Sequence, residues 1–314
     1  MWDVGFHLTI SGGMSVNKVA VLLVGFGGPE TLSEVPSFVE SVLDRKPPDH
    51  VTVGALDRYR AIGGGSPLPA TTRRQAFLVG EELNRRGVDA EVHVGMLHAR
   101  PTIDEAIAEI KRTGVADLRV ISLAPYRCEV STDAYEEAVR RAVGESDPRL
   151  AFAPDWNANP TYVKALAEML ASALAKAPRR VPVIFSAHSL PKRMIEQGDP
   201  YADQLYETAS LVAEDLSVTN WHLAYQSVSA AAREPWLEPS VEQVMEDLAG
   251  EGASAVLVNP IGFISDHVET LYDNDIEHRA RAGDLGLAFY RCRCLNEHPG
   301  LIKTLADLAV SVDA

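Results

Sequence analysis

The sequence alternates short runs of Val, Ile and Leu with longer amphipathic stretches, and this alternation constrains the fold more than any other feature. Short, nearly continuous apolar runs are typical of strands that are buried on both faces of a parallel sheet. The runs lie at 18–26, 90–97, 118–125, 181–188, 221–227, 254–263 and 285–292. Because helical patterns separate them, we expect βαβ units with right-handed crossovers, and hence an α/β fold.

The amphipathic stretches carry the start signals of helices. Proline or an N-capping side chain stands near the beginning of each stretch. Ser240 opens one of them with Gln243 three positions later, which is the spacing of a capping box. Helices are therefore predicted at 67–87, 101–114, 159–178, 240–252 and 298–312.

The pattern is interrupted around residues 145–180, and this break divides the chain. We predict two similar Rossmann-like, doubly wound domains with parallel sheets, at 18–150 and 151–297, facing each other. The last helix, 298–312, is expected to pack back on the first domain. Residues 1–13 lack the basic start and long apolar stretch of a signal peptide, and residues 1–17 are expected to form a disordered extension.

Composition excludes several classes of protein. The 29 basic and 44 acidic residues leave a net charge of −15, which repels nucleic acid and anionic lipid. No apolar run approaches the roughly 18–20 residues of a membrane span, so at most peripheral membrane contact is expected. Three cysteines are too few for a disulfide scaffold and indicate a reducing, cytoplasmic location.

The acidic stretch "GFISDHVETLYDNDIE" (262–277) follows a predicted strand directly. Glu269, Asp273 and Glu277 are spaced four apart, which places them along one face of a helix at a cost of about 0.2–0.5 kcal/mol per like-charged pair. Together with a neighbouring imidazole, such carboxylates suit a divalent cation that is held weakly and passed on. The alternative is a solvated acidic helix face, which is our interpretation of Asp275.

Two other features lie at predicted strand ends, where ligands bind in such folds. "FSAHSLP" (185–191) places His188 at the end of a buried strand, as a functional group or as a hydrogen-bonded structural residue. "GFGGPE" (25–30) and "IGGGSPL" (62–68) lack the motifs of nucleotide-binding loops. Their glycines either form tight turns or let a flat ligand approach the backbone.

These segments, together with "YQS…PWLEP" (225–239) and "CLNEHP", resemble the ferrochelatase family over roughly 18–308. The resemblance implies two Rossmann-like domains with a porphyrin cleft between them. It also implies a lyase that inserts Fe²⁺ into protoporphyrin IX or coproporphyrin III in haem biosynthesis, with loss of two pyrrole protons. Its partners would be the porphyrin, the haem product and Fe²⁺, and the chain would be a monomer or homodimer.

The resemblance also assigns roles to residues. His188 and Glu269 match the catalytic histidine and carboxylate, and both would contact the metal. Asp273 and Glu277 match an acidic ladder that would also carry metal. We expect His188 and Glu269 on opposite faces of the macrocycle, with His188 as proton acceptor. The candidate substrate-binding residues are Phe26, Tyr126, Ser186, Trp236, Asp266 and His267.

The sequence departs from the family pattern in two segments, "GMLHARP" (95–101) and "VSAAAREP" (228–235). These changes leave open a chelatase for another tetrapyrrole or metal, such as cobalt or nickel, and a non-enzymatic haem- or porphyrin-binding homologue. Some family members carry a [2Fe–2S] cluster on four cysteines. Three cysteines cannot supply four thiolates, so we expect no cluster and no other tightly bound cofactor.

Overall fold

The computed structural model describes residues 19–144, 148–228 and 234–312, and within them the strands form two four-stranded parallel sheets with the same topology. The strand orders are β2-β1-β3-β4 and β6-β5-β7-β8. The strands of the first sheet are β1 (Val19–Gly25), β2 (Ala90–Met96), β3 (Asp117–Ser122) and β4 (Arg149–Phe152). Those of the second are β5 (Val183–His188), β6 (Trp221–Gln226), β7 (Ala255–Asn259) and β8 (Ala288–Arg291). The predicted fold class is confirmed.

Each predicted apolar run overlaps one of these strands, but β4 was missed. Its four residues pair only with β3, and none of them is fully buried. A short edge strand of this kind lacks the continuous apolar run that identifies a central strand. The predicted extension 1–17 lies outside the described residues.

The helices follow their start signals. The predicted ones are α3 (Leu68–Arg85), α4 (Ile103–Thr113), α6 (Pro160–Leu174), α9 (Val241–Gly250) and α11 (Pro299–Ser311). Capping boxes at Thr102 and Ser240 fix the starts of α4 and α9. Not predicted were α1 (Val35–Leu43), α2 (Asp49–Ala61), α5 (Ala134–Val143), α7 (Lys192–Glu196), α8 (Tyr201–Asp215) and α10 (Arg279–Asp284).

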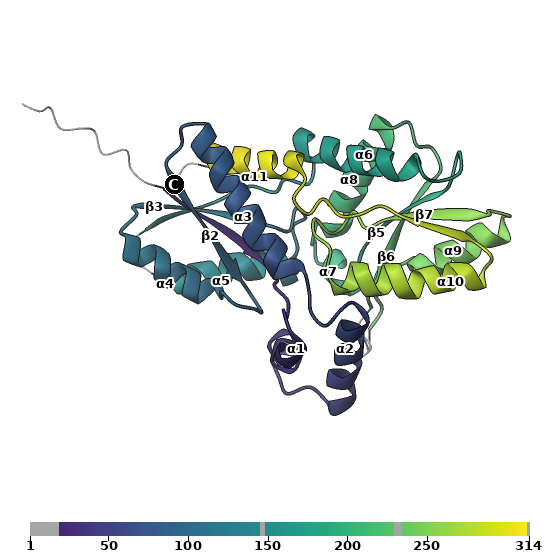
Figure 1. Cartoon of the computed structure of the whole chain (residues 1–314), viewed down its shortest axis with the longest axis horizontal. Helices are drawn as coiled ribbons and strands as arrows, with labels where there is room; N and C mark the ends of the chain where they lie inside the picture. Colours follow the sequence, from purple (N-terminus) through teal and green to yellow (C-terminus); the bar gives the residue numbers. More distant parts are fainter. Residues whose placement is uncertain (1–18, 145–147, 229–233, 313–314) are drawn as a thin grey trace, which may run out of the picture.

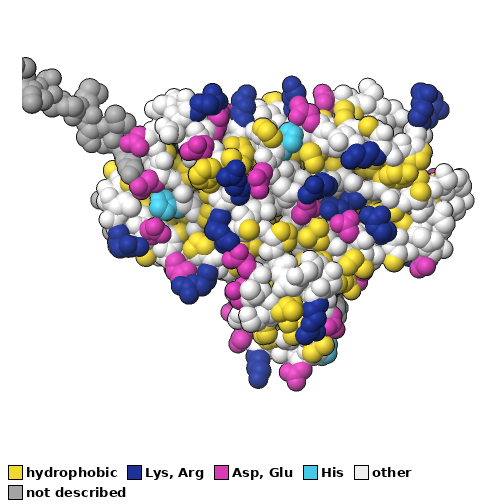
Figure 2. Space-filling model, in the orientation of Figure 1, with side chains coloured by type: hydrophobic (Ala, Val, Ile, Leu, Met, Phe, Trp, Pro, Cys, Tyr) yellow, Lys and Arg dark blue, Asp and Glu magenta, His cyan; other side chains and the backbone are white. Residues whose placement is uncertain are grey.

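The two sheets lie side by side along the long axis, and α11 runs across the top of the molecule towards the first sheet (Figure 1). Arg119 of β3 donates to the carbonyl of Ala309 at 2.6 Å, and Arg86 donates to Asp307 at 2.6 Å. Helices α1 and α2 project together from the opposite side (Figure 1). On the face shown in Figure 2, acidic and basic side chains are interspersed rather than gathered by sign.

Buried polar contacts join the two domains beneath the sheet ends. Gln75 of α3 is fully buried and donates to Ser265 Oγ at 2.9 Å and to the carbonyl of Asn296 at 2.6 Å. The hydroxyl of Tyr126, after β3, donates to the carbonyl of Ile261, after β7, at 2.9 Å.

No helix of the described residues is long and apolar enough to cross a membrane.

The glycine-rich turns pack on each other. A Cβ at Gly65 would lie 2.0 Å from the carbonyl oxygen of Glu30, and Ser66 N donates to the carbonyl of Pro29 at 2.7 Å. Gly27 has φ of +91°, a conformation that favours glycine. Close packing of the two turns therefore accounts for Gly65, and the backbone conformation accounts for Gly27.

Candidate active site

Strand β5 delivers His188 to the carboxyl end of the second sheet. The strand is buried up to Ala187, whereas 33% of the His188 side chain is exposed. The imidazole Nδ1 lies 2.5 Å from the carbonyl oxygen of Ser189. A carbonyl only accepts hydrogen bonds, so Nδ1 carries a proton and Nε2 is directed to the neighbouring carboxylate.

Glu269 is the first residue of η3 (Glu269–His278), which is a π-helix rather than the expected α-helix. Gln226, at the end of β6, donates to the carbonyl of Glu269 at 2.7 Å. π-Helical turns are rare and occur frequently at functional sites. The wider turn still keeps residues four apart as neighbours, so Glu269, Asp273 and Glu277 remain close in the order that the sequence predicted.

The Glu269 carboxylate lies between two imidazoles. Its Oε1 is 3.5 Å from His188 Nε2, and its Oε2 is 3.5 Å from His267 Nε2. One quarter of the Glu269 side chain is exposed. The expectation that His188 and Glu269 face opposite sides of the macrocycle is wrong, because a porphyrin cannot lie between groups only 3.5 Å apart. Both must approach a substrate from the same side.

His188 and Glu269 each shift the pKa of the other. Burial disfavours the charged imidazole of His188, but the adjacent Glu269 carboxylate outweighs it and raises the His188 pKa to about 9. Burial likewise opposes ionisation of Glu269, but His188 and then His267 hold its pKa well below the usual value. At neutral pH the site is therefore a protonated His188 beside an ionised Glu269.

Asp273 is almost fully buried and is bonded on both sides. Arg58 of α2 pairs with one carboxylate oxygen, and the Ser227 hydroxyl donates to the other. Burial nevertheless raises the pKa of Asp273. Arg58 comes from the first domain and places a positive charge beside the carboxylates of η3 in the second. It also stacks on Tyr272 at 5.1 Å from the ring centre.

Glu277 lies one step further along η3 and is exposed. Desolvation and the negative charge of Asp273 raise the Glu277 pKa. Glu277, Asp273 and Glu269 therefore form a line that runs from the surface to His188.

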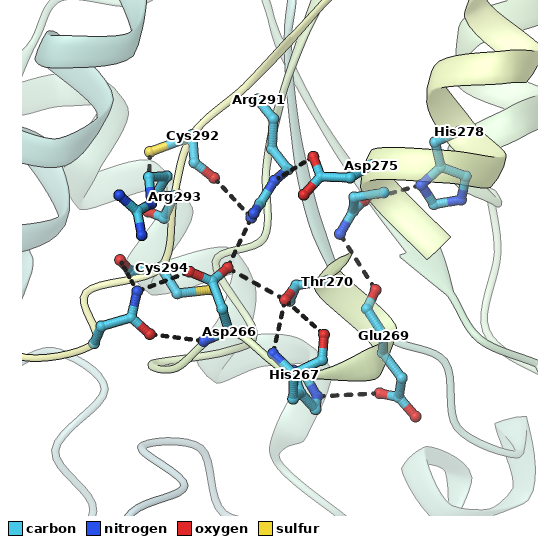
Figure 3. A network of polar contacts seen from close by, with 12 residues as sticks. Asp266, His267, Glu269, Thr270, Asp275, His278, Arg291, Cys292, Arg293 and Cys294 are labelled. Carbon is cyan, nitrogen blue, oxygen red and sulfur yellow. Dashed lines mark hydrogen bonds and ion pairs between the residues drawn. The ribbon is translucent and has the colours of Figure 1, made fainter. Parts of the chain in front are cut away.

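Asp266 is held in a buried network (Figure 3). Its carboxylate accepts from Arg291 Nη1 at 2.9 Å and from Asn296 Nδ2 at 2.7 Å. Burial opposes its charge, but the positive charge of Arg291 lowers the Asp266 pKa. Asp275 was interpreted as solvated surface, which is wrong: it accepts from Arg291 Nε at 2.8 Å.

The other candidate substrate-binding residues are scattered. The Trp236 ring lies 6.4 Å from the His188 ring, and Phe26 is partly exposed beside His98, with 4.6 Å between ring centres. Tyr126 is buried at the domain junction, and Ser186 is fully buried on β5. The structure brings Trp236 and His267 to the His188–Glu269 pair, whereas Tyr126 and Ser186 lie in the interior.

Sequence reasoning missed Arg58, Ser227 and Arg291. Arg58 contacts a residue 215 positions away, which no local pattern reveals. Among the described residues, no group of three or more His, Cys, Asp or Glu side chains is arranged to hold a metal ion. The arrangement is an ion pair of His188 and Glu269 with a line of carboxylates leading to it.

The sequence and the fold of this chain are similar to those of known proteins. A family model described as Ferrochelatase matches residues 18–312. A "Ferrochelatase" from Deinococcus radiodurans is 36% identical over 299 residues, covering 92% of this chain and 94% of that protein. A "Coproporphyrin III ferrochelatase" from Halalkalibacterium halodurans is 34% identical over 302 residues, covering 94% and 97%. The structure of SirB from Bacillus subtilis with Fe³⁺ aligns with a TM-score of 0.61 at 13% identity over 93% of this chain and 94% of that one, which shows a shared fold.

Proposed function

The chain belongs to the ferrochelatase family, and we propose that its His188–Glu269 pair carries out the metal insertion of that family. It is a lyase that inserts Fe²⁺ into a porphyrin in haem biosynthesis. The observation that carries the catalytic assignment is the 3.5 Å contact between His188 Nε2 and Glu269 Oε1 at the carboxyl end of β5. This contact gives one site both a base and an anionic group for a cation.

The balance of the reaction gives each group a task. Insertion replaces two pyrrole N–H bonds by Fe–N bonds, so two protons leave the porphyrin for each iron. His188 is the proton acceptor, and its partial exposure lets it pass protons to water. With a pKa of about 9 it is protonated at rest, so it must first lose a proton. Fe²⁺ arriving at Glu269 favours that loss, because metal binding competes with protons.

Glu277 and Asp273 provide the approach for Fe²⁺ or for leaving protons. Glu277 is exposed, Asp273 is buried, and Glu269 lies at the site, which supports movement from the surface inward. Arg58 offsets the charge of Asp273, so a cation would be held weakly there and released onward. Weak successive sites suit transfer better than one tight site does.

The porphyrin substrate is protoporphyrin IX or coproporphyrin III. The decisive experiment is anaerobic Fe²⁺ insertion with both porphyrins side by side, and we expect insertion into at least one of them. Tight binding of both porphyrins without insertion would contradict the proposed catalysis and would favour a non-enzymatic porphyrin-binding protein. Insertion of only cobalt or nickel would instead indicate a chelatase for another metal.

We propose that the protein has no resident cofactor and no [2Fe–2S] cluster. Its three cysteines are buried, and burial raises the pKa of Cys128 and of Cys292 to about 12, which keeps the thiols protonated. An iron–sulfur absorption band in purified protein would refute this. Free thiols support a reducing, cytoplasmic location. We also propose that the protein is a monomer or a homodimer.

A further inference from the structure

We propose that Arg291 is a positioning residue that holds the π-helix η3 so that Glu269 stays between His188 and His267. This inference rests on the proposed function. The ion pairs of Arg291 go to Asp266 and Asp275, and none of its described contacts is with His188 or Glu269, so its effect on the reaction would act through the backbone that carries Glu269.

One guanidinium ties together two parts of the segment. Arg291 lies at the end of β8, and only 8% of its side chain is exposed. Nη1 donates to Asp266 Oδ1 at 2.9 Å, and Nε donates to Asp275 Oδ1 at 2.8 Å. Asp266 precedes η3 and Asp275 lies within it. Arg291 at the end of β8 thereby fixes both Asp266, just before η3, and Asp275, in a later turn of η3.

The tie at Asp266 extends to the imidazole beside Glu269. Thr270 Oγ1 lies 3.3 Å from Asp266 Oδ1 and accepts the backbone N–H of His267 at 2.9 Å. The Asn296 side chain donates from Nδ2 to the Asp266 carboxylate at 2.7 Å, and its Oδ1 accepts the backbone N–H of Asp266 at 2.8 Å. Because His267 Nε2 is 3.5 Å from Glu269, fixing Asp266 also fixes this neighbour of the carboxylate.

The tie at Asp275 acts on the helix itself. Regular π-helical turns are rare, so a π-helix of this length needs support from its surroundings. Glu269 begins η3, and the direction of its side chain depends on where the first turn starts. Asn274, next to Asp275, lies 3.4 Å from the Glu269 carbonyl through its side-chain amide. Fixing the position of Asp275 therefore also fixes Asn274, whose side chain contacts the Glu269 carbonyl.

Lysine cannot replace this arrangement. The planar guanidinium presents Nε and Nη1 to two acids at once, whereas an ammonium group is a point charge on a flexible stem. Arg291→Lys keeps a positive charge near Asp266, which avoids leaving that buried carboxylate unpaired. It loses the simultaneous contact with Asp275. The substitution thus separates the positioning effect from a simple loss of charge.

The test compares Arg291→Lys with Arg279→Lys in the full chain, using anaerobic Fe²⁺ insertion into the porphyrin that the wild type accepts. Arg279 is the matched control, because it also pairs with Asp275, at 3.6 Å, but half of its side chain is exposed. We expect kcat of Arg291→Lys to fall on the order of 10- to 100-fold, as a misplaced group does. KM for the porphyrin should stay within about 2-fold, and Arg279→Lys should keep wild-type kcat within about 2-fold.

A second pair of variants guards against a folding defect. Asp275→Ala removes the helix end of the tie at a partly exposed position, and we expect the same loss of kcat with unchanged porphyrin KM. Asp275→Asn keeps an acceptor for Arg291 and should recover most of the activity. Wild-type kcat in folded Arg291→Lys and Asp275→Ala overturns the proposal, as does an equal loss in Arg279→Lys. Failure of the proposed function would appear separately, as an inactive wild type.

Discussion

His188 Nε2 and Glu269 Oε1 lie 3.5 Å apart, although one residue ends a strand and the other begins a π-helix 81 positions later in the chain. Burial opposes the charge of each side chain, yet each stabilises the ionised form of the other. The pair therefore acts as one unit that stores a proton at neutral pH. Changing either residue changes both.

Loss of either partner should nearly abolish metal insertion. We expect His188→Ala and Glu269→Gln each to lower kcat by on the order of 10²–10⁴-fold, the usual contribution of a positioned acid or base. Both side chains are partly exposed, so the fold should persist, as circular dichroism would show. Near-wild-type turnover in both variants would contradict the assignment.

The pKa of His188 should depend on Glu269. In the wild type the carboxylate raises it to about 9, against the effect of burial. In Glu269→Gln the largest raising influence is gone while burial remains, so the His188 pKa should fall well below its wild-type value. Histidine titration by NMR measures this directly. A His188 pKa still near 9 in Glu269→Gln would show that another group sets it.

The same pair should make stability depend on pH. The folded pKa of His188, about 9, exceeds its usual value of 6.5, so its contribution is complete below pH 6.5 and is lost as the pH rises through about 9. The lowered pKa of Glu269 contributes above about 4.5 and is lost in acid. The difference in Tm between wild type and Glu269→Gln should thus be largest between pH 4.5 and 6.5. A difference that grows towards pH 10 would contradict the pairing.

Asp273→Asn should weaken iron uptake more than porphyrin binding. Asp273 lies between the exposed Glu277 and the site, so losing its charge would remove one step of the proposed approach. We expect KM for Fe²⁺ to rise several-fold while KM for the porphyrin stays unchanged. Asp247→Asn, on the exposed side of α9, is the matched control. An unchanged KM for Fe²⁺ would remove Asp273 from the path.

Local signals in the sequence were sufficient for the central strands and for several helix starts. The capping box at Ser240 is formed as expected, because it depends on side chains within a few positions of the helix start. The edge strand β4 and helix α8 were missed. Propensity says little about β4, whose four residues are held by pairing with β3.

The candidate site was predicted only in part for the same physical reason. His188 and Glu269 were named as candidates, but their expected relative placement was wrong because it depends on the turn that follows β7. The π-helix could not be distinguished from an α-helix by spacing alone. Arg58 and Arg291 reach their acids from other elements, 215 and 25 positions away, so only the folded chain brings these charges together.

Gly262 should be indispensable for that turn. A Cβ at this position would lie 2.6 Å from the Cβ of Ala187, the residue before His188, so the turn could not stay against β5. Gly262 N also donates to the carbonyl of Ser186 at 3.1 Å. We expect Gly262→Ala to cost about 1–3 kcal/mol of unfolding free energy, as overpacking does, and to lower kcat.

Gly54→Ala is the matched control for this prediction. Gly54 lies exposed within α2, with no atom within 4 Å of an added Cβ, so alanine there should stabilise the protein by about 0.5–1 kcal/mol. Denaturant unfolding and insertion assays on both variants provide the comparison. Equal stability and equal activity of the two variants would mean that the β7 turn can shift without disturbing His188, so the contact between Gly262 and Ala187 would not set the geometry of the site.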